Sequence, residues 1–199
     1  MKIICTDLEG IYLPEIWIKF AEKTGIDELR LTTRDISDYD VLMQKRLSIL
    51  KENNLKLKDI TDVIKTIEPL NGAIEFLDWL RSVVQVIVVS DTFIEFATPL
   101  MKKLGRPALF CHNLIIDPKG AITGYNLRQK DSKRKTVQAL KGLNFDVIAI
   151  GDSYNDVSML KEAEQGILFN PPAKVKNEFP NFSVTHGYDE LKPLLIELI

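Results

Sequence analysis

The sequence has few of the residues that build disulfide frameworks and zinc sites, and it has no long hydrophobic run. Cys5 and Cys111 are its only cysteines. Both stand beside apolar residues without CxxC spacing, so we expect buried free thiols, as suits a reducing cytoplasm. His112 and His186 form no HExxH or paired-cysteine pattern, which argues against zinc. Apolar runs reach only a few residues, whereas a bilayer span needs about 20. A membrane-spanning segment is therefore excluded.

The sequence also has no clear excess of positive or negative charge. Lys and Arg number 26 against 28 Asp and Glu, a formal net charge of −2. Domains that bind nucleic acid are usually strongly basic, so the charge balance gives no case for such a partner. The first residues, Met1 to Asp7, lack the apolar region and cleavage site of a signal peptide. We expect a cytoplasmic protein with no nucleic-acid or membrane partner, and its oligomeric state stays open, a homodimer included.

Short apolar runs alternate with amphipathic stretches along most of the chain. Runs without polar alternation are typical of strands buried on both faces of a parallel sheet. The pattern predicts strands at 2–6, 84–89, 146–150 and, more weakly, 166–169. It predicts helices at 73–81, 93–104, 133–141 and 154–163, and a hairpin around the turn Asp117–Gly120. This alternation favours an α/β fold with a doubly wound, Rossmann-like parallel sheet.

One region breaks the alternation, because residues 12–71 contain helical patterns and no good strand. The expected helices cover 14–23, 39–53 and 59–67; Trp17 lies on the first, and it and Trp79 are interpreted as packing residues. Glu68–Gly72 has the composition of a return linker. We therefore divide the chain into an α/β core, residues 1–11 and 72–199, and a small inserted helical cap domain, residues 12–71.

Three predicted strands end in acidic residues. Ligands of open α/β sheets gather at the carboxyl ends of the strands, so these residues are expected to meet. Carboxylates brought together repel one another unless a cation is present, and oxygen ligands without His or Cys favour Mg²⁺. The residues are Asp7 and Glu9 after the first strand, Asp91 after the second, and Asp152 and Asp156 after a later one.

A carboxylate beside Mg²⁺ can attack phosphorus, forming an aspartyl-phosphate. A second acid must then protonate the leaving alkoxide and activate water. The transferred phosphoryl group also needs donors and cations around it, and Ser90 and Lys133 are candidates. Lys133 stands at a predicted helix N-terminus, where backbone N–H groups favour an anion.

In this order, Asp7-Leu-Glu-Gly, Ser90, Lys133 and Gly151-Asp-Ser-Tyr-Asn-Asp resemble the four motifs of the haloacid-dehalogenase superfamily. The helical insert after the first motif matches the small-cap subclass. Within the superfamily the chain resembles the phosphoserine phosphatases, most of all the bacterial type that is also a homoserine phosphotransferase. The likeness covers essentially the whole chain, including residues 14–18, 45–51 and 90–93.

The resemblance implies a Mg²⁺-dependent phosphatase acting on O-phospho-L-serine. It makes Asp7 the nucleophile and a metal ligand. Glu9 becomes the general acid and base, and its backbone carbonyl also binds the metal. Asp152 is the third protein ligand, and Asp156 supports the metal and Lys133.

The resemblance also implies a substrate site. Ser90 and Lys133 would hold the phosphoryl oxygens, and Asn155 would contact the substrate or Lys133. Glu15 and Arg46 match positions that hold the ammonium and carboxylate of an amino acid. The residue types agree, because arginine binds carboxylates in bidentate fashion and a glutamate pairs with an ammonium group.

Two residues depart from the usual motifs. The acid two positions after the nucleophile is normally Asp and here is Glu9, whose longer arm changes its reach. The second motif normally continues with two glycines, whereas here it continues with Asp91 and Thr92. Both departures resemble the phosphotransferase subtype, so we place Asp91 in the substrate site and predict phosphoryl transfer to homoserine.

Other functions are open at this point. The enzyme could hydrolyse another small phosphomonoester, or it could be a degenerate member of the fold that binds an amino acid without catalysis. A phosphorylated receiver domain also carries an aspartate at a strand end. That class expects an adjacent acidic pair after the first strand and no large helical insert, so the spacing of Asp7 and Glu9 argues against it.

Overall fold

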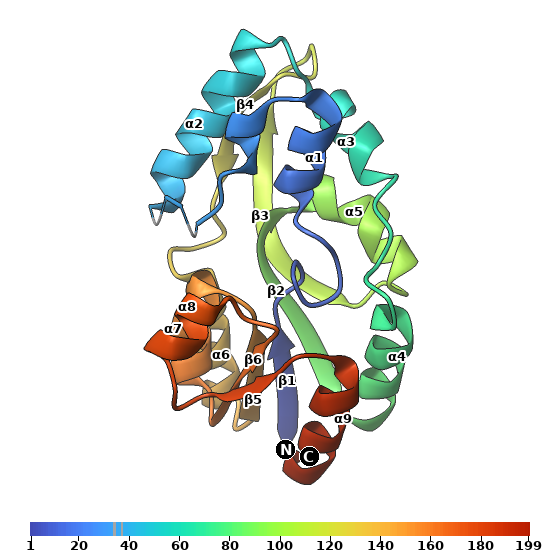
Figure 1. Ribbon diagram of the computed structural model, residues 1–199, viewed down its shortest axis with the longest axis vertical. Helices are drawn as coiled ribbons and strands as arrows, with labels where there is room; N and C mark the ends of the chain where they lie inside the picture. The colour runs from blue at the N-terminus through green and yellow to red at the C-terminus, as the bar shows by residue number, and fades with distance from the viewer. Residues whose placement is uncertain (34, 37) are drawn as a thin grey trace.

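A seven-stranded sheet runs through the computed structural model, which describes residues 1–33, 35–36 and 38–199 (Figure 1). Its strand order is β4-β3-β2-β1-β5-β6-β7. Neighbouring strands are parallel except β3 and β4, which form an antiparallel hairpin. The predicted doubly wound α/β sheet is thus confirmed. The strands are β1 (Lys2–Thr6), β2 (Gln85–Phe93), β3 (Ala108–Ile116), β4 (Ile122–Asn126), β5 (Asp146–Gly151), β6 (Gln165–Phe169) and β7 (Ser183–Thr185).

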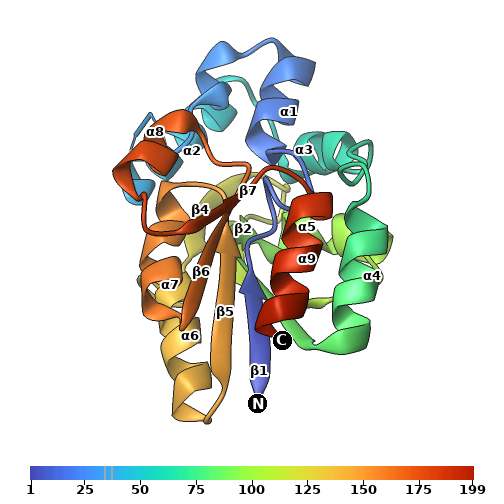
Figure 2. The same cartoon turned by 60° about the horizontal axis from the view of Figure 1, so that its bottom comes forward.

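Helices cover both faces of the sheet, which explains why its central strands are apolar without alternation (Figure 2). In β1, Ile3 and Cys5 pack on one face, while Ile4 packs on the other. One face is covered by α6 (Ser132–Gly142), α7 (Val157–Glu162) and α8 (Ala173–Glu178). The opposite face is covered by α4 (Ala73–Val83), α5 (Ile94–Lys103) and α9 (Tyr188–Leu198).

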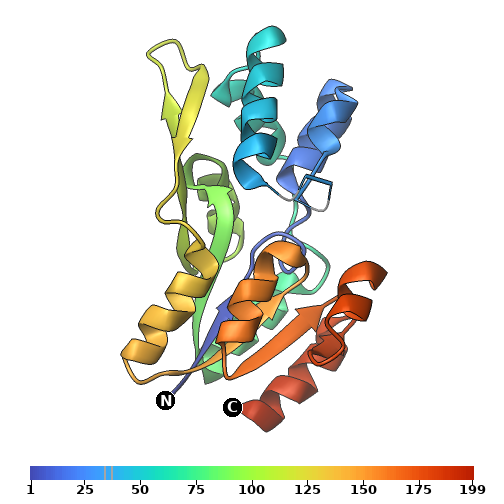
Figure 3. The ribbon, with the colours of Figure 1, turned by 90° about the vertical axis from the view of Figure 1, so that its left-hand side faces the viewer.

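The inserted segment is helical, as expected. It contains α1 (Ile16–Thr24), the 3-10 helix η1 (Asp27–Arg30), α2 (Tyr39–Glu52) and α3 (Leu57–Ile64), which lie together beyond one end of the sheet (Figure 3). The first helix begins at Ile16 and not at Pro14, because Glu15 has a non-helical backbone and serves as the N-cap residue. The division of the chain into a core and a cap at residues 12–71 stays a prediction.

The hairpin of β3 and β4 extends alongside the inserted helices. The Tyr125 hydroxyl donates a hydrogen bond of 2.5 Å to Asp40 of α2, and the backbone N–H of Leu57 donates one of 3.0 Å to the Gly120 carbonyl. The Tyr39 and Tyr125 rings also meet edge to face. The inserted helices are therefore held at two points by a part of the chain that follows them by some 60 residues or more.

Some details differ from the sequence predictions. The strand predicted to end at 89 runs on to Phe93, and the predicted helix at 154–163 begins as a 3-10 turn, η2 (Tyr154–Asp156). Cys5 is buried as expected, but Cys111 is only partly buried, because β4 pairs with β3 only from Asn113 onward. No helix within the described residues is both long and apolar enough to cross a bilayer.

An aromatic stack helps to hold the helix α9 against the sheet, together with the buried Leu191 and Leu195. The Tyr188 ring lies 4.7 Å from Phe76 of α4 and 5.1 Å from Phe169 of β6, centroid to centroid, and its hydroxyl donates to the Ile11 carbonyl. Replacing Tyr188 with Leu should lower the free energy of unfolding by about 2 kcal/mol, because both ring contacts are lost. Urea denaturation measures this loss. Tyr188→Phe, which keeps the stack, should lose less than half as much, and equal losses would show that the stack contributes little.

Candidate active site

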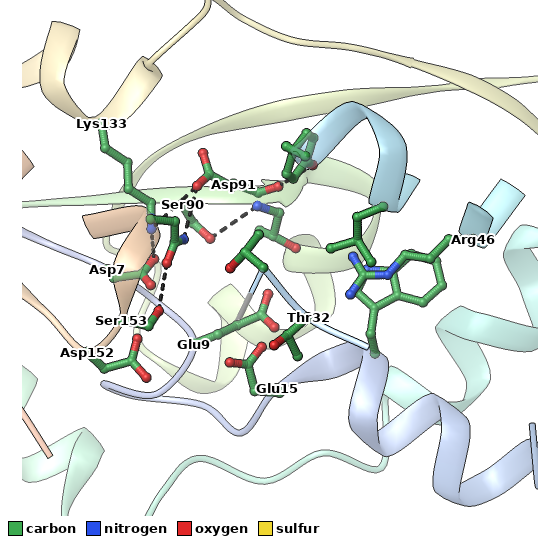
Figure 4. A pocket seen from close by; sticks show the side chains of 16 residues that line it. Asp7, Glu9, Glu15, Thr32, Arg46, Ser90, Asp91, Lys133, Asp152 and Ser153 are labelled. Carbon is green, nitrogen blue, oxygen red and sulfur yellow. Dashed lines mark hydrogen bonds and ion pairs between the residues drawn. The ribbon is translucent and has the colours of Figure 1, made fainter. Parts of the chain in front are cut away.

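Side chains from three strand ends and one helix of the α/β part of the chain meet in one pocket (Figure 4). Asp7 follows β1, Ser90 and Asp91 lie near the end of β2, and Asp152 follows β5. These strands are neighbours or near neighbours in the sheet, so their carboxyl ends are brought to one edge. Lys133 enters from the first turn of α6. The sheet topology alone therefore gathers residues that are far apart in the sequence.

A cluster of buried carboxylates lies at one end of the pocket and behind it. Oxygens of Asp7, Asp152 and Asp156 lie within 4.8 Å of one another. Asp156 accepts hydrogen bonds from Lys133 at 2.7 Å and from the backbone N–H groups of Asp152 and Ser153 at 2.9 and 3.2 Å. These bonds fix the loop after β5. Asp156 thereby supports Asp152 and Lys133.

This donor set fits a hard divalent cation. All its ligand atoms are oxygens, and the cluster has a single ammonium group, that of Lys133, against three carboxylates. Burial raises the pKa of Asp7 well above its usual range, and the charges of Asp156 and Asp152 act in the same direction, against Lys133. A cation between Asp7 and Asp152 would reverse this effect and keep Asp7 ionised.

Two glycines allow the carboxylates to come this close. A Cβ atom at Gly10 would lie 2.5 Å from Asp152 Oδ2, and one at Gly151 would lie 2.3 Å from Asp156 Cβ. Gly10 also has a φ of +77°, which other residues rarely adopt. The glycine of the first motif is therefore required by both the turn and the packing of the acidic cluster.

Lys133 is the central cation of the site. Its Nζ lies 3.0 Å from Asp7 Oδ1, 2.7 Å from Asp156 and 3.7 Å from Asp91. Burial by itself would lower the pKa of Lys133, but these carboxylates outweigh it and raise the pKa well above its usual range. The lysine is therefore charged at every physiological pH.

Asp91 belongs to a second network on the pocket wall. It accepts a hydrogen bond from Asn155 Nδ2 at 3.1 Å, and its other oxygen lies 3.5 Å from Nε2 of the buried His112. The N–H of Arg128 donates to His112 Nδ1 at 3.1 Å, which leaves Nε2 as the nitrogen facing Asp91. Burial would raise the pKa of Asp91, but Lys133, His112 and Asn155 hold it below its usual range.

Near the inserted helices the pocket holds a different set of groups. The Glu9 carboxylate accepts the N–H of Ile16 at 2.9 Å, at the start of α1. Burial and the neighbouring Glu15 raise the pKa of Glu9 to about 8, against the influence of the Ile16 N–H and Arg46. Figure 4 shows Glu9 and Glu15 side by side, with Arg46 beyond them and Lys133 at the opposite side of the pocket.

Arg46 of α2 is almost completely buried. Its Nη2 donates to the Leu31 carbonyl at 2.8 Å, and its guanidinium carbon lies 4.4 Å from the centre of the Trp17 ring. Burial lowers the pKa of Arg46 to about 10, so the group remains charged at neutral pH. Among the described residues its Nε has no hydrogen-bond partner.

Comparison with known proteins places this site in a family. A model of haloacid dehalogenase-like hydrolases matches residues 4–164. The chain is 60% identical to a protein named phosphoserine phosphatase ThrH from Pseudomonas aeruginosa, over 96% of this chain and 94% of that one. It is 58% identical to a phosphoserine phosphatase from Pseudomonas syringae pv. tomato, over 99% of this chain and 83% of that one. The chain belongs to the haloacid dehalogenase-like hydrolases, and within them it groups with the phosphoserine phosphatases.

The fold agrees with this membership. A solved structure described as a phospho-aspartyl intermediate analogue of phosphoserine phosphatase superposes with a TM-score of 0.77 at 24% identity, over 97% of this chain and 98% of that one. At this identity the likeness concerns the fold alone.

The hydrolase motifs predicted from the sequence meet in space. Asp156 is buried behind the pocket, and the other predicted site residues line it: Asp7, Glu9, Glu15, Arg46, Ser90, Asp91, Lys133, Asp152 and Asn155. Their individual roles stay predictions. The carboxylate cluster of Asp7, Asp152 and Asp156 does not include the side chain of Glu9, which points to Glu15; the expected ligand there is the Glu9 backbone carbonyl.

Several residues of the site were not predicted. His112 pairs with Asp91, Tyr39 donates its hydroxyl to the Asp91 carbonyl at 2.9 Å, and Trp17 covers Arg46. Thr32 and Ser153 also line the pocket. Among these residues only His112 could have been suggested by the sequence, because its strand, β3, pairs with β2. The register that sets His112 opposite Phe93, however, cannot be predicted from composition.

The glycine of the first motif gives a direct test of the cluster. Gly10→Ala should lower kcat by at least about tenfold, because a methyl group at 2.5 Å forces Asp152 away from Asp7. Phosphatase assays at saturating Mg²⁺ measure the effect. Gly120→Ala is the matched control, since Gly120 has a similar φ of +82° but no atom within 4 Å of its added Cβ. Equal loss of activity in both variants would contradict the packing argument.

Proposed function

We propose that the protein is a Mg²⁺-dependent phosphatase that hydrolyses O-phospho-L-serine through a phosphorylated Asp7. The observation that carries this proposal is the arrangement of one pocket, with Asp7, Lys133 and Asp152 on one side and Glu15 and Arg46 on the other. The first set suits a phosphoryl group, and the second suits an ammonium and a carboxylate. The curated relatives that are 60% and 58% identical are named phosphoserine phosphatases, which supports the same substrate.

The first half-reaction transfers the phosphoryl group to the protein. Asp7 Oδ attacks phosphorus, the bond between phosphorus and the serine oxygen breaks, and Glu9 gives its proton to that oxygen. A carboxyl whose pKa lies at about 8 is protonated at neutral pH and can serve as this acid. In the second half-reaction water attacks phosphorus, its proton passes to Glu9, and the bond to Asp7 breaks.

Charge on the phosphoryl group is balanced by neighbouring donors. Lys133 and the Ser90 hydroxyl would bind its oxygens, and Asn155 would fix the position of this wall through Asp91. Asp7, Asp152 and the Glu9 backbone carbonyl would hold Mg²⁺, with Asp156 in support, and the bound ion neutralises phosphoryl charge. Asp91 adds negative charge beside Lys133. This distinguishes the pocket from one built on the usual second motif, in which glycine follows the serine.

Residues of the proposed cap supply the recognition of an amino acid. Glu15 would pair with the substrate ammonium and Arg46 with its carboxylate. Both residues lie in the segment 12–71, whereas Asp7 and Lys133 lie in the proposed core. We infer that substrate is held between the two parts, so that closure of the cap excludes bulk water during transfer.

We also propose homoserine as a phosphoryl acceptor. Homoserine carries the same ammonium and carboxylate as serine, so Glu15 and Arg46 suit it as well. Its hydroxyl would take the place of water in the second half-reaction, and Glu9 would accept its proton. The longer arm of Glu9 and the carboxylate of Asp91, both departures from the usual motifs, support an acceptor other than water.

Substrate choice is tested by phosphate release from a panel of small phosphomonoesters with Mg²⁺. O-phospho-L-serine should give the highest kcat/KM, chelation by EDTA should stop the reaction, and Asp7→Asn should reduce kcat by more than about 10⁴-fold while the fold is kept. Circular dichroism of Asp7→Asn confirms the fold.

A preference for phosphosugars by orders of magnitude would contradict the substrate assignment, although the core chemistry would stand. Serine binding in calorimetry without phosphate release would instead identify a binding protein. Lasting phosphorylation without turnover would identify a receiver.

Acceptor choice is tested separately. With phosphoserine as donor and homoserine added, ³¹P NMR should show phosphohomoserine, and serine should form faster than inorganic phosphate. D-homoserine is the matched control, because its ammonium and carboxylate cannot both reach Glu15 and Arg46 with the hydroxyl in the same position. Equal serine and phosphate at every homoserine concentration would show that water is the sole acceptor.

A further inference from the structure

The guanidinium group of Arg46 lies over the aromatic face of Trp17 where the inserted helices line the pocket. The two residues come from different helices, α1 and α2, and both line the pocket. The guanidinium carbon lies 4.4 Å from the ring centre, within the range of a cation–π interaction. The sequence suggested only that Trp17 packs in the core.

The Trp17 ring is itself held rigidly. Phe20 meets it edge to face at 6.3 Å, and Phe96 of α5 does so at 5.7 Å, with interplanar angles of 75° and 73°. Phe96 in turn meets Phe93 at the end of β2, next to the phosphoryl-binding segment of Ser90 and Asp91. The orientation of the indole is therefore set by the α/β part of the molecule as well as by its own helix.

Arg46 needs such a support because its hydrogen bonds do not fix the guanidinium plane. Nη2 donates to the Leu31 carbonyl at 2.8 Å, but Nη1 donates only to the weak acceptor Met43 Sδ at 3.7 Å, so the group could still rotate about the bond to Leu31. A flat ring over its face blocks this rotation. Bidentate binding of a carboxylate requires the guanidinium plane to be fixed, and the buried Nε, which has no partner among the described residues, leaves a donor for it.

We propose that Trp17 is a positioning residue that fixes the plane of Arg46 and thereby sets the preference for substrates with a carboxylate. The inference rests on the proposed function, since it assigns the Arg46 guanidinium to the carboxylate of an amino-acid substrate. Trp17 does not touch the reacting atoms. Its loss should weaken binding of the carboxylate and leave the phosphoryl chemistry unchanged.

The test compares two substrates in Trp17→Leu. O-phosphoethanolamine keeps the phosphate and the ammonium of phosphoserine and lacks its carboxylate. For phosphoserine, KM should rise about tenfold with little change in kcat, the loss expected for a cation–π contact in a desolvated site. For phosphoethanolamine, kcat/KM should stay within about twofold, and so should the inhibition constant of inorganic phosphate. Trp17→Phe, which keeps an aromatic face, should recover most of the affinity for phosphoserine.

Trp79 supplies a matched control for the substitution. It is the other tryptophan of the chain, and Lys192 lies 4.7 Å over its ring, away from the pocket. Trp79→Leu should change neither substrate's KM. In an Arg46→Met background, Trp17→Leu should have no further effect on phosphoserine, because Trp17 acts through the guanidinium.

If Trp17→Leu does not fold, fluorinated tryptophan incorporated at position 17 provides a second test of the cation–π contact. In a Trp79→Phe background, Trp17 is the single tryptophan, and each added fluorine weakens the negative face of the ring with little change in its size. The KM for phosphoserine should rise with the number of fluorine atoms, and that for phosphoethanolamine should not.

Two results would overturn the inference: an equal effect of Trp17 substitution on both substrates, or an undiminished effect in the Arg46→Met background. Either would assign Trp17 to packing alone. A wild-type enzyme that releases no phosphate from phosphoserine would instead overturn the proposed function. The two failures are thus separated by the wild-type measurement.

Discussion

The repulsion among buried carboxylates is the constraint on which this structure depends. Asp7, Asp152 and Asp156 are held within 4.8 Å of one another, and Lys133 is the cation that the chain itself places among them. Such a cluster is stable only if its neighbours are fixed, because each unpaired charge carries a large cost of desolvation. Three features fix this arrangement: the glycines at 10 and 151, the hydrogen bonds that Asp156 accepts from backbone N–H groups, and the meeting of parallel strand ends.

The pocket joins two parts of the chain that contribute different chemistry. The strand ends supply the carboxylates of Asp7 and Asp152, while the segment around α1 and α2 supplies Glu15, Arg46 and the ring of Trp17. These parts are linked by packed aromatic rings from Phe93 through Phe96 to Trp17. A side chain of α2 also reaches the sheet directly, since Tyr39 donates to the Asp91 carbonyl. The two groups of pocket residues are therefore built on one packed framework.

Much of this could be predicted from the sequence, and the reason is physical. Buried parallel strands are read from apolar runs such as Lys2–Thr6, and the carboxyl ends of such strands must meet, so Asp7, Asp91 and Asp152 could be assigned to one site without coordinates. The contacts between individual side chains could not be predicted from the sequence. His112 faces Asp91 because of the register between β3 and β2, and Trp17 covers Arg46 because two separate helices bring these residues together. β7 is too short, at three residues, to give a pattern.

The charges around Lys133 favour the binding of an additional cation in the pocket. A lysine with a single acidic neighbour could offer most of its charge to a phosphate. Here three carboxylates lie within 3.7 Å of the Lys133 ammonium, so its charge is already balanced by the protein. A dianionic phosphoryl group entering beside Asp91 would meet net negative charge. A divalent ion held by Asp7 and Asp152, as proposed, would offset this charge and make the pocket more attractive to a phosphoryl group than Lys133 alone could.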